Sequence, residues 1–382
     1  ALDNLLSGDF MGRVPRLPAA ALALVLALGA GVAATLVTGA GRNVLVYAAF
    51  LCVPPAMGVA FFLAGLWLPV VVLEASVLVT LTGSGVANYA TEGKQKRYIK
   101  NAFQQYLSPA VIEELIAHPE RLKLGGERRV LSIFFSDLQG FTGISEGLSP
   151  EELTALLNDY LSAMTDIIQE EGGTVDKYEG DAIIAFWNAP LSQEDHAARA
   201  VRAALRCQKT LARLRPEFRQ RMGRDLCMRI GINTGPAVVG NMGSHSRFDY
   251  TMLGDAVNLA ARLEGINKQF GTYTMISRDT LSQAGDGFPA RELSRVAVVG
   301  RAKPVTVYEP MLPEEYRQRG ELLAAFAEGL QAYYAGDFER AARLFERIAD
   351  TDPPAARYLE RCRELMEHPP ESWDGVWVMT AK

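Results

Sequence analysis

Residues 17–90 contain only two charged side chains, Arg42 and Glu74, and this scarcity of charge limits what the segment can fold into. A helix of a water-soluble domain needs a polar face, which this segment cannot supply. Its residues divide into three apolar stretches, each about long enough to cross a ~30 Å hydrocarbon layer as a helix: Leu17–Thr38, Val44–Trp67 and Leu68–Ala90. The sequence therefore predicts three transmembrane helices and a membrane-embedded protein.

Positive charge sets the expected orientation. The third stretch is followed by a group of basic residues, Lys94, Lys96, Arg97 and Lys100. Basic residues beside a span stay in the cytoplasm, so we expect the long C-terminal part to be cytosolic. The N-terminal tail is then outside, although Arg13 and Arg16 oppose the rule there. Glu74 indicates either a polar contact inside the helix bundle or a tolerated carboxylate near a helix end.

Cysteine spacing and net charge limit the kinds of metal site, compartment and partner that the sequence supports. The four cysteines show no metal-ligand or C-x-x-C spacing, which is typical of a reducing cytosol. A net charge of −5 gives no reason to expect a nucleic-acid partner. No initiating Met or charged leader precedes residues 1–16, and we interpret them as the C-terminal remnant of an extracytoplasmic sensor domain.

Residues 91–127 are expected to form a signalling helix or linker. Apolar residues recur at helical intervals from Ile99 to Ile116. Pro109 interrupts the pattern, and the stretch is shorter than three clean heptads. A short coiled coil and a plain amphipathic tether therefore both remain open.

Strand and helix patterns alternate further along the chain. The strands are expected at 129–136, 174–178, 181–187 and 228–233, and the helices at 150–171 and 194–215. The order β-α-β-β-α-β is that of a ferredoxin-like fold, so the fold class is α+β. The first and third strands are central antiparallel neighbours in this topology. Asp137 ends the first and Asp181 begins the third, so we expect their carboxylates to meet at one edge of the sheet.

Two neighbouring carboxylates at a sheet edge indicate a metal site. Asp137 alone is compatible with a turn cap. Together, Asp137 and Asp181 repel one another unless a divalent cation lies between them, and oxygen ligands suit Mg²⁺ or Mn²⁺. Gly140 and Gly143 allow the backbone amides after Asp137 to turn toward a phosphate. A metal-free acid pair is the alternative.

Two more groups of polar residues accompany this pair. Lys177 lies four positions before Asp181, across the same tight turn. Asn258 and Arg262 are one turn apart on one face of a helix expected after Gly254. Such a pair suits phosphate charge and ribose oxygens, although an exposed helix face would look the same.

The motifs FSDLQGFT (135–142), KYEGDAIIAFW (177–187) and YTMLGDAVNLAAR (250–262) together resemble the catalytic domain of class III nucleotidyl cyclases. The resemblance covers about residues 128–310. It implies that Asp137 and Asp181 hold two Mg²⁺ or Mn²⁺ ions per active site. The residues it assigns to the metal site and the phosphates, through the backbone that follows the first aspartate, are Leu138, Phe141 and Thr142.

The resemblance also implies how the rest of the nucleotide is held. Lys177 and Thr251 would read adenine, Asn258 would orient the ribose, and Arg262 would stabilise the pentavalent phosphorus. The terminal phosphates would be contacted by Arg301, with Lys303 as the alternative. Thr251 departs from the Asp of animal membrane cyclases and from the Cys of guanylyl cyclases, and resembles a bacterial subclass.

These features predict an adenylate cyclase that converts ATP to 3′,5′-cyclic AMP and pyrophosphate in signal transduction. The resembling family builds its active site between two chains, and this chain carries both halves, so a homodimer is expected. A guanylate cyclase is one alternative, disfavoured by Lys177. A catalytically inactive nucleotide-binding receptor module is the other, disfavoured by the complete residue set.

The flanking segments also resemble the family. The three spans after a tail such as NLLSGDF look like those of bacterial cyclases with a CHASE2 sensor, which places the protein as multi-pass in the bacterial inner membrane. Residues 313–382 contain two amphipathic helices of tetratricopeptide type. One such unit cannot form a solenoid, so we expect it to pack on the catalytic domain as a cap, with partner recruitment as the alternative.

Overall fold

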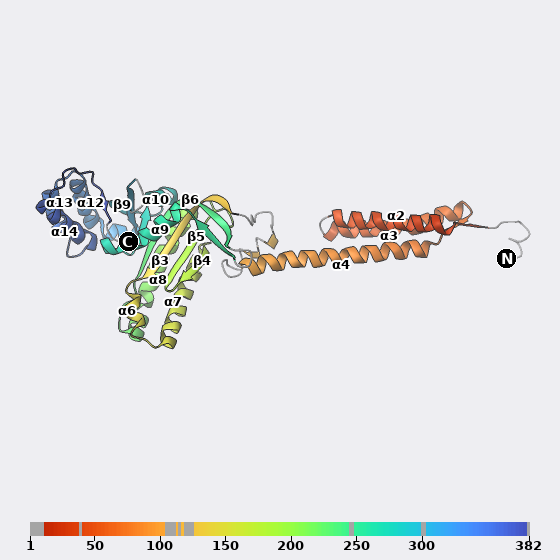
Figure 1. Ribbon diagram of the computed structural model, residues 1–382, viewed down its shortest axis with the longest axis horizontal. Helices are drawn as coiled ribbons and strands as arrows, with labels where there is room; N and C mark the ends of the chain where they lie inside the picture. The colour runs from red at the N-terminus through yellow and green to blue at the C-terminus, as the bar shows by residue number, and fades with distance from the viewer. Residues whose placement is uncertain are drawn as a thin grey trace, which may run out of the picture. The chain divides into compact units, whose positions relative to one another are not determined.

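The structure is a computed structural model in two compact units, Ala1–Asn101 and Ala102–Lys382 (Figure 1). It describes residues 11–37, 40–103, 112–113, 116–117, 126–243, 248–298 and 303–379.

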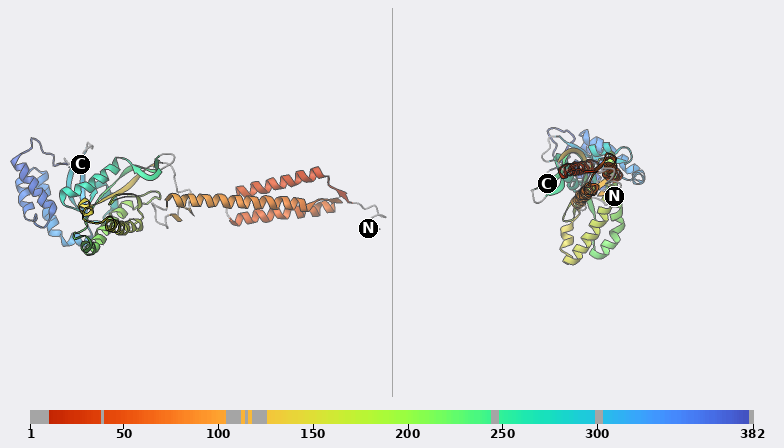
Figure 2. Two further views of the ribbon diagram at one scale, coloured as in Figure 1. Left: turned by 60° about the horizontal axis from the view of Figure 1, so that its bottom comes forward. Right: turned by 90° about the vertical axis from the view of Figure 1, so that its right-hand side faces the viewer.

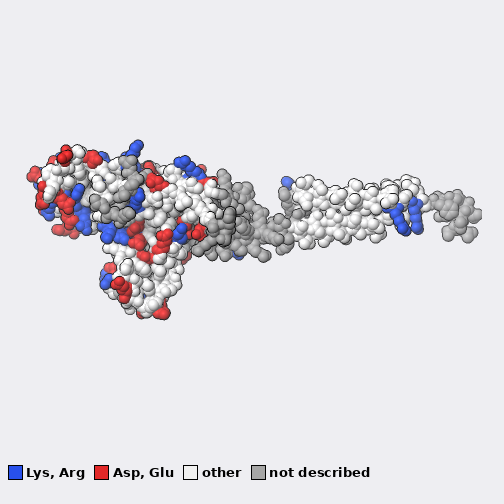
Figure 3. Space-filling model, viewed as in Figure 1, with Lys and Arg blue, Asp and Glu red and all other residues white. Residues whose placement is uncertain are grey.

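The first unit is built from three long apolar helices, α2 (Arg16–Leu36), α3 (Ala40–Leu63) and α4 (Val70–Phe103). Short strands β1 (Gly12–Arg13) and β2 (Leu66–Trp67) pair in parallel beside them. By length and composition the three helices are candidate membrane spans. Their described surface carries almost no charge, which suits contact with lipid (Figure 3).

Helix α4 differs from the prediction because it continues without a break from the third apolar stretch to Phe103. The start of the expected linker at residue 91 is therefore part of a single 34-residue helix. This part of the helix contains no proline, which would break it, and Gly83, Gly85 and Gly93 are all accommodated within it. Most of the remaining linker, including Pro109, lies outside the described residues.

The second unit contains the predicted order of strands and helices. These elements are β3 (Glu127–Leu138), α7 (Pro150–Glu170), β4 (Thr174–Glu179), β5 (Ala182–Trp187), α8 (His196–Met222) and β6 (Met228–Gly243). Strand β3 is central and pairs antiparallel with β5 and β6, while β4 pairs with β5. The order β4-β5-β3-β6 is that of a ferredoxin-like sheet, so this prediction is confirmed.

Some predicted boundaries were wrong. Asp181 lies in the turn before β5 rather than within the strand. Helix α8 continues past Pro216 and ends at Met222, where Gly223 takes a left-handed conformation with φ 71°. Strand β6 extends well beyond residue 233, because its second half pairs with the start of β3 and with β7 (Phe248–Leu253).

The sheet continues beyond the ferredoxin-like core on the far side of β6. The additional elements are α9 (Asp255–Phe270), β8 (Thr274–Ser277), α10 (Arg278–Ala284), β9 (Ala290–Ala297) and β10 (Val305–Pro310). Strand β8 pairs in parallel with β6, and β10 joins β8 to β9. The path through the described strands also includes the short strand β11 (Trp377–Val378) and runs β11-β9-β10-β8-β6-β3-β5-β4, with β7 paired to β6.

The C-terminal segment is helical, with more helices than expected. It contains α11 (Pro313–Gln318), α12 (Gly320–Tyr334), α13 (Phe338–Glu346), α14 (Pro353–Glu367) and the short strand β11 (Trp377–Val378). Two amphipathic helices were expected, and α14 adds a third long helix that begins at an Asp-Pro boundary. Likeness to a tetratricopeptide unit remains a prediction.

Side-chain alternation in β6 explains how helices cover both faces of the sheet. Met228, Ile230 and Ile232 face the core formed with α7 and α8. The odd positions face α9, and a Cβ at Gly231 would lie 2.1 Å from the backbone nitrogen of Glu264. Only glycine allows this approach, which brings α9 directly onto the strand. Figures 1 and 2 show α7 and α8 on one face and α9 on the other.

Candidate active site

Asp137 and Asp181 lie at the same edge of the sheet, at the end of β3 and in the turn before β5. The Asp181 carboxylate accepts a hydrogen bond of 2.9 Å from the backbone N–H of Leu138. The side chain of Asp137 is 36% exposed, so a ligand from solvent can reach it. The topology predicted from the sequence thus brings the two aspartates together.

The electrostatics of this edge favour a bound cation. Burial raises the pKa of Asp181, and the negative charge of Asp137 raises it further. Burial also raises the pKa of Glu264, to which the charges of Asp137 and Asp181 contribute. Three carboxylates therefore share one region, and the charge of Asp137 disfavours ionisation of Asp181 and Glu264.

Arg229 lies between two of these carboxylates and was not predicted from the sequence. Its guanidinium donates to Asp137 at 2.8 Å and to Glu264 at 2.9 Å. Arg229 stands directly opposite Asp137 in the β3–β6 register and is mostly buried. The sequence feature that could have indicated this role is that Arg229 is a charged residue between Met228 and Ile230, in a strand that is otherwise apolar at this end.

The aspartates fit a metal that binds together with a substrate. The described part of the chain has no group of three or more His, Cys, Asp or Glu side chains arranged to hold a metal ion. Magnesium is commonly held by one or two carboxylates together with phosphate oxygens and waters. Asp137 and Asp181 therefore fit a cation that arrives with a polyphosphate.

The glycine turn after β3 leads into a short helix, α6 (Phe141–Ser145). Gly140 adopts φ 71°, a left-handed conformation that glycine tolerates without strain. Phe141 packs against the main core and fixes the turn, whereas Thr142 is exposed. The predicted phosphate-binding residues thus follow Asp137 directly, on an anchored turn.

Lys177 and Thr251 are brought together by a residue that the sequence did not single out, Asp176. The Thr251 hydroxyl, on β7, donates to Asp176 at 2.7 Å, and Lys177 Nζ lies 3.9 Å from the same carboxylate. Asp176 is only 6% exposed, and its Oδ1 has no hydrogen-bond partner among the described residues. Burial raises its pKa, while Thr251 and Lys177 lower it.

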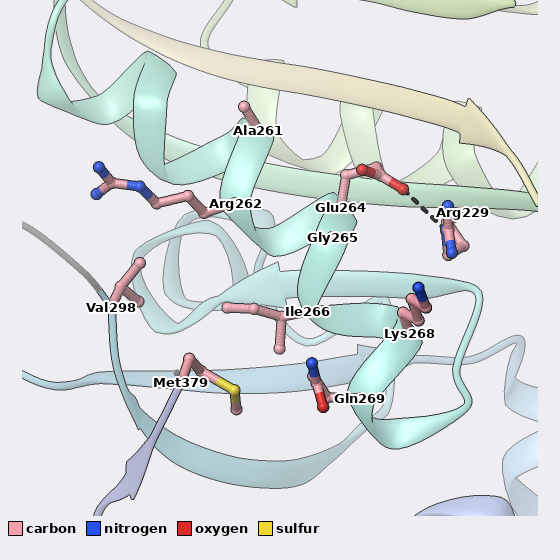
Figure 4. A pocket seen from close by; sticks show the side chains of 10 residues that line it. All are labelled: Arg229, Ala261, Arg262, Glu264, Gly265, Ile266, Lys268, Gln269, Val298 and Met379. Carbon is pink, nitrogen blue, oxygen red and sulfur yellow. Dashed lines mark hydrogen bonds and ion pairs between the residues drawn. The ribbon is translucent and has the colours of Figure 1, made fainter. Parts of the chain in front are cut away.

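Asn258 and Arg262 lie one turn apart on α9, as predicted. Asn258 is exposed and Arg262 is half-buried, and neither side chain has a hydrogen-bond or ion-pair partner within the residues that the structure describes. Figure 4 shows Arg262 on one side of α9 and the Glu264–Arg229 pair on the other. The structure therefore does not direct Arg262 toward Asp137 of its own chain.

A cavity of about 570 Å³ follows the C-terminal half of α9. Arg229, Arg262 and Lys268 supply positive charge to its wall, and Val298 and Met379 supply apolar surface. Arg301 lies outside the described residues, while Lys303 is exposed just before β10. The prediction that one of these two contacts a terminal phosphate stays untested.

Comparison with known proteins finds a family match for the segment that carries this site. Residues 127–309 match the family model of the adenylate and guanylate cyclase catalytic domain. The match covers just under half of the chain, and it shows that this segment is similar to the catalytic domain of class III adenylate and guanylate cyclases.

Curated relatives include adenylate cyclase 1 of Rhizobium meliloti (strain 1021), 37% identical over 182 residues, which are 48% of this chain and 27% of that protein. The adenylate cyclase of Anabaena cylindrica is 33% identical over 221 residues, 56% of this chain and 42% of that protein. The chain thus spans less than half the length of either relative.

Solved structures with similar sequences include both types of cyclase. The crystal structure of the adenylyl cyclase CyaB from P. aeruginosa is 39% identical, with 49% of this chain and 96% of that chain covered and a TM-score of 0.46. That of the guanylyl cyclase Cya2 is 40% identical, with 49% and 94% covered and a TM-score of 0.45.

Proposed function

We propose that the protein is a membrane-anchored adenylate cyclase that converts ATP to 3′,5′-cyclic AMP and pyrophosphate in signal transduction. The observation that carries the choice of ATP is the hydrogen bond from Thr251 to Asp176, beside Lys177. The names of the curated relatives support the same choice.

The hydrogen bond determines which groups remain available to a base. An ionised carboxylate only accepts hydrogen bonds, so the Thr251 hydroxyl donates its proton to Asp176. The Thr251 oxygen then remains available as an acceptor for the base. Adenine offers an amino donor at N6, whereas guanine offers an acceptor oxygen at the matching position. Lys177 supplies a donor for the unprotonated N1 of adenine, which in guanine carries a proton. The trio therefore suits adenine.

The reaction needs charge neutralisation and positioning more than a nucleophilic side chain. The 3′-oxygen of ATP forms a bond to the α-phosphorus, the bond from phosphorus to the bridging oxygen breaks, and pyrophosphate leaves. The hydroxyl proton passes to solvent. Two divalent cations held by Asp137, Asp181 and the backbone at Leu138 would supply Lewis-acid charge to the attacking hydroxyl and the phosphates.

The side chains of this pocket contribute the remaining roles. Arg262 would stabilise negative charge on the reacting phosphorus, and Asn258, one turn earlier, would orient the ribose. Phe141 and Thr142 would hold the turn that faces the phosphates. The Arg229 guanidinium pairs with Asp137. Once a cation binds the Asp137 carboxylate, the guanidinium would release it and bind a phosphate of the substrate instead.

A homodimer supplies a complete site. The side chains of Asn258 and Arg262 lack partners among the described residues, and Arg262 lies on the side of α9 away from the Glu264–Arg229 pair (Figure 4). In a two-fold dimer each chain can offer its aspartates to one site and its α9 pair to the other. The three apolar helices would anchor both chains in the membrane, with the catalytic domain in the cytoplasm.

Product analysis tests the proposal. The purified chain, supplied with ATP or GTP and with Mg²⁺ or Mn²⁺, should form cyclic AMP at the higher kcat/KM. Lys177→Glu with Thr251→Cys should lower ATP use by a few kcal/mol in transition-state terms, because mismatched buried hydrogen-bonding groups carry about that cost. Cyclic GMP as the main product would establish the guanylate alternative. No turnover with either nucleotide would leave an inactive receptor module.

A further inference from the structure

Helix α9, which carries Asn258 and Arg262, has a second support outside the catalytic segment. One face of α9 lies on β6, where Gly231 lets the backbones approach. The other face enters a separate apolar core that contains Leu263, Ile266 and Phe270. That core is otherwise made largely by β9 and the C-terminal helices, including Phe326, Tyr333, Phe345, Tyr358 and Met379.

Direct contacts hold the C-terminal end of α9 against this segment. The ring of Phe270, its last residue, lies 5.2 Å from Trp377 and 6.1 Å from Tyr358. Gly271, with φ 69°, follows, and a Cβ there would lie 2.7 Å from Cβ of Pro353. The start of α14 therefore sits directly on the end of α9, where only glycine fits.

Strand β11 connects the same contacts to the cavity beside Arg262. Trp377 pairs with Val296 of β9, and the Met379 N–H donates to the Ala297 carbonyl at 3.2 Å. Met379 and Val298 are then both buried and line the cavity (Figure 4). Ile266, one turn after Arg262 on the same helix face, lines it as well.

We propose that β11 and Met379 position α9, and through it Arg262, so that the C-terminal segment is a working part of the catalytic site. This inference rests on the proposed cyclase function. Trp377 and Met379 are positioning residues, because they act through α9 and touch no substrate. A shift of α9 by a fraction of an ångström would misplace Arg262 and leave the base-reading residues Lys177 and Thr251 unchanged.

Kinetics of the full chain in detergent test the proposal. Trp377→Ala should lower kcat about ten- to a hundredfold, the scale for a remotely caused misplacement of a catalytic group, with KM for ATP within about twofold. Trp377→Phe should restore most of the rate by keeping an aromatic contact with Phe270. The matched control is Val378→Ala on the same strand, since Val378 is 61% exposed and is not among the described residues that line the cavity beside Arg262.

A double-mutant cycle separates positioning from general damage. In an Arg262→Ala background, Trp377→Ala should lower the residual kcat by less than about twofold, because the group that it misplaces is already absent. An equal loss in both backgrounds would overturn the proposal, as would a folded Trp377→Ala variant with wild-type kcat. If Trp377→Ala melts below the assay temperature, Met379→Ala replaces it in the same cycle.

Hydrogen exchange gives a readout that does not depend on turnover. Trp377→Ala should speed amide exchange in the second half of α9 relative to Val378→Ala, with α7 unchanged. Unchanged α9 exchange would contradict the proposed coupling. Accelerated α9 exchange in a protein that makes no cyclic nucleotide would instead count against the proposed function and leave the mechanical coupling standing.

Discussion

Arg229 and Asp137 form an ion pair of 2.8 Å between strands β6 and β3, at the place where the sequence predicts a metal. The guanidinium also binds Glu264 and so offsets part of the negative charge at this edge. In the proposed reaction a cation would compete with this ion pair for the Asp137 carboxylate. The pair would then open when a metal–nucleotide complex binds.

Arg229→Ala should lower stability most when no metal is present. Removing the guanidinium leaves Asp137 and Glu264 without their positive partner, and a partly buried polar group without its partner costs about 1–3 kcal/mol. Millimolar Mg²⁺ or Mn²⁺ should recover part of this loss, because a cation replaces the missing charge. Urea unfolding in EDTA and in Mg²⁺ measures both quantities.

The matched control for this change is Arg221→Ala. Arg221 pairs with Asp159 at 2.7 Å on the surface, and such exposed pairs contribute about 0–1 kcal/mol. Its effect should be small and independent of metal. An Arg229→Ala loss that is equally independent of metal would show that no cation binds at Asp137.

Asp137→Asn and Asp181→Asn should both abolish turnover but have opposite effects on metal-free stability. Asp137→Asn weakens the pair with Arg229, so unfolding should become easier. Asp181→Asn removes a carboxylate whose pKa is raised by burial and by Asp137, and the new amide oxygen can still accept a hydrogen bond from the Leu138 N–H. The free energy of unfolding of Asp181→Asn should therefore rise. Near-normal Mg²⁺-dependent activity in either variant would contradict the metal assignment.

The Asp181→Asn gain should depend on pH in a defined direction. Below the usual pKa near 3.8, Asp181 is protonated in both the folded and the unfolded chain and contributes nothing. As pH rises from there through the raised folded pKa, the folded state holds the proton longer, so the free energy of unfolding of the wild type falls. The difference in free energy of unfolding between Asp181→Asn and the wild type should therefore grow over this pH range and then level off.

Asp352→Ala should destabilise the contact between the catalytic sheet and the C-terminal helices. Asp352 is fully buried, caps α14 and accepts from Arg291 at 2.9 Å and from Arg319 at 3.1 Å. Its removal leaves Arg291 with Glu309 alone, and breaking a buried pair costs about 3–5 kcal/mol.

The control for Asp352→Ala is Glu339→Ala, which breaks an exposed pair with Arg343 in α13 and should cost under about 1 kcal/mol. Thermal unfolding of the two variants gives the comparison. Equal losses would mean that the buried network adds nothing beyond a surface ion pair.

The sequence predicted the parts of this protein that depend on local pattern. The strand order placed Asp137 beside Asp181 because a ferredoxin-like topology makes the first and third strands antiparallel neighbours. Arg229 and Asp176 were not predicted, because their roles come from register and from cross-strand packing with Glu264 and Thr251. No local signal carries those pairings, since the partners are 35 and 75 residues apart.

The C-terminal segment shows the same limit. The sequence indicated a helical cap, and α12 to α14 do pack on the catalytic segment. What it could not indicate was that Trp377 would reach Phe270 at the end of α9, more than a hundred residues earlier. That contact depends on the last strand returning to β9, and a two-residue strand has no periodicity to detect.

The position of Arg262 yields a test of how the site is shared between chains. Asp137→Asn and Arg262→Ala should each retain only a small residual activity alone. In a mixed dimer one site collects both defects, while the other takes its aspartates from the Arg262→Ala chain and its arginine from the Asp137→Asn chain. With random pairing half the dimers are mixed and half their sites are intact, so co-expression should return roughly a quarter of wild-type activity per site.

Two co-expressions that cannot complement serve as controls for this test: Asp137→Asn with Asp181→Asn, and Arg262→Ala with Asn258→Ala. In each mixed dimer the two chains are defective in the same kind of half-site, so each of the two sites contains one defect and no intact site forms. Cross-linking establishes that the chains have paired. Because Arg262 points away from the Glu264–Arg229 pair of its own chain (Figure 4), recovery is expected only for Asp137→Asn with Arg262→Ala. Paired chains that stay inactive in this combination would place Asp137 and Arg262 in one site of a single chain, and the shared-site homodimer would be wrong.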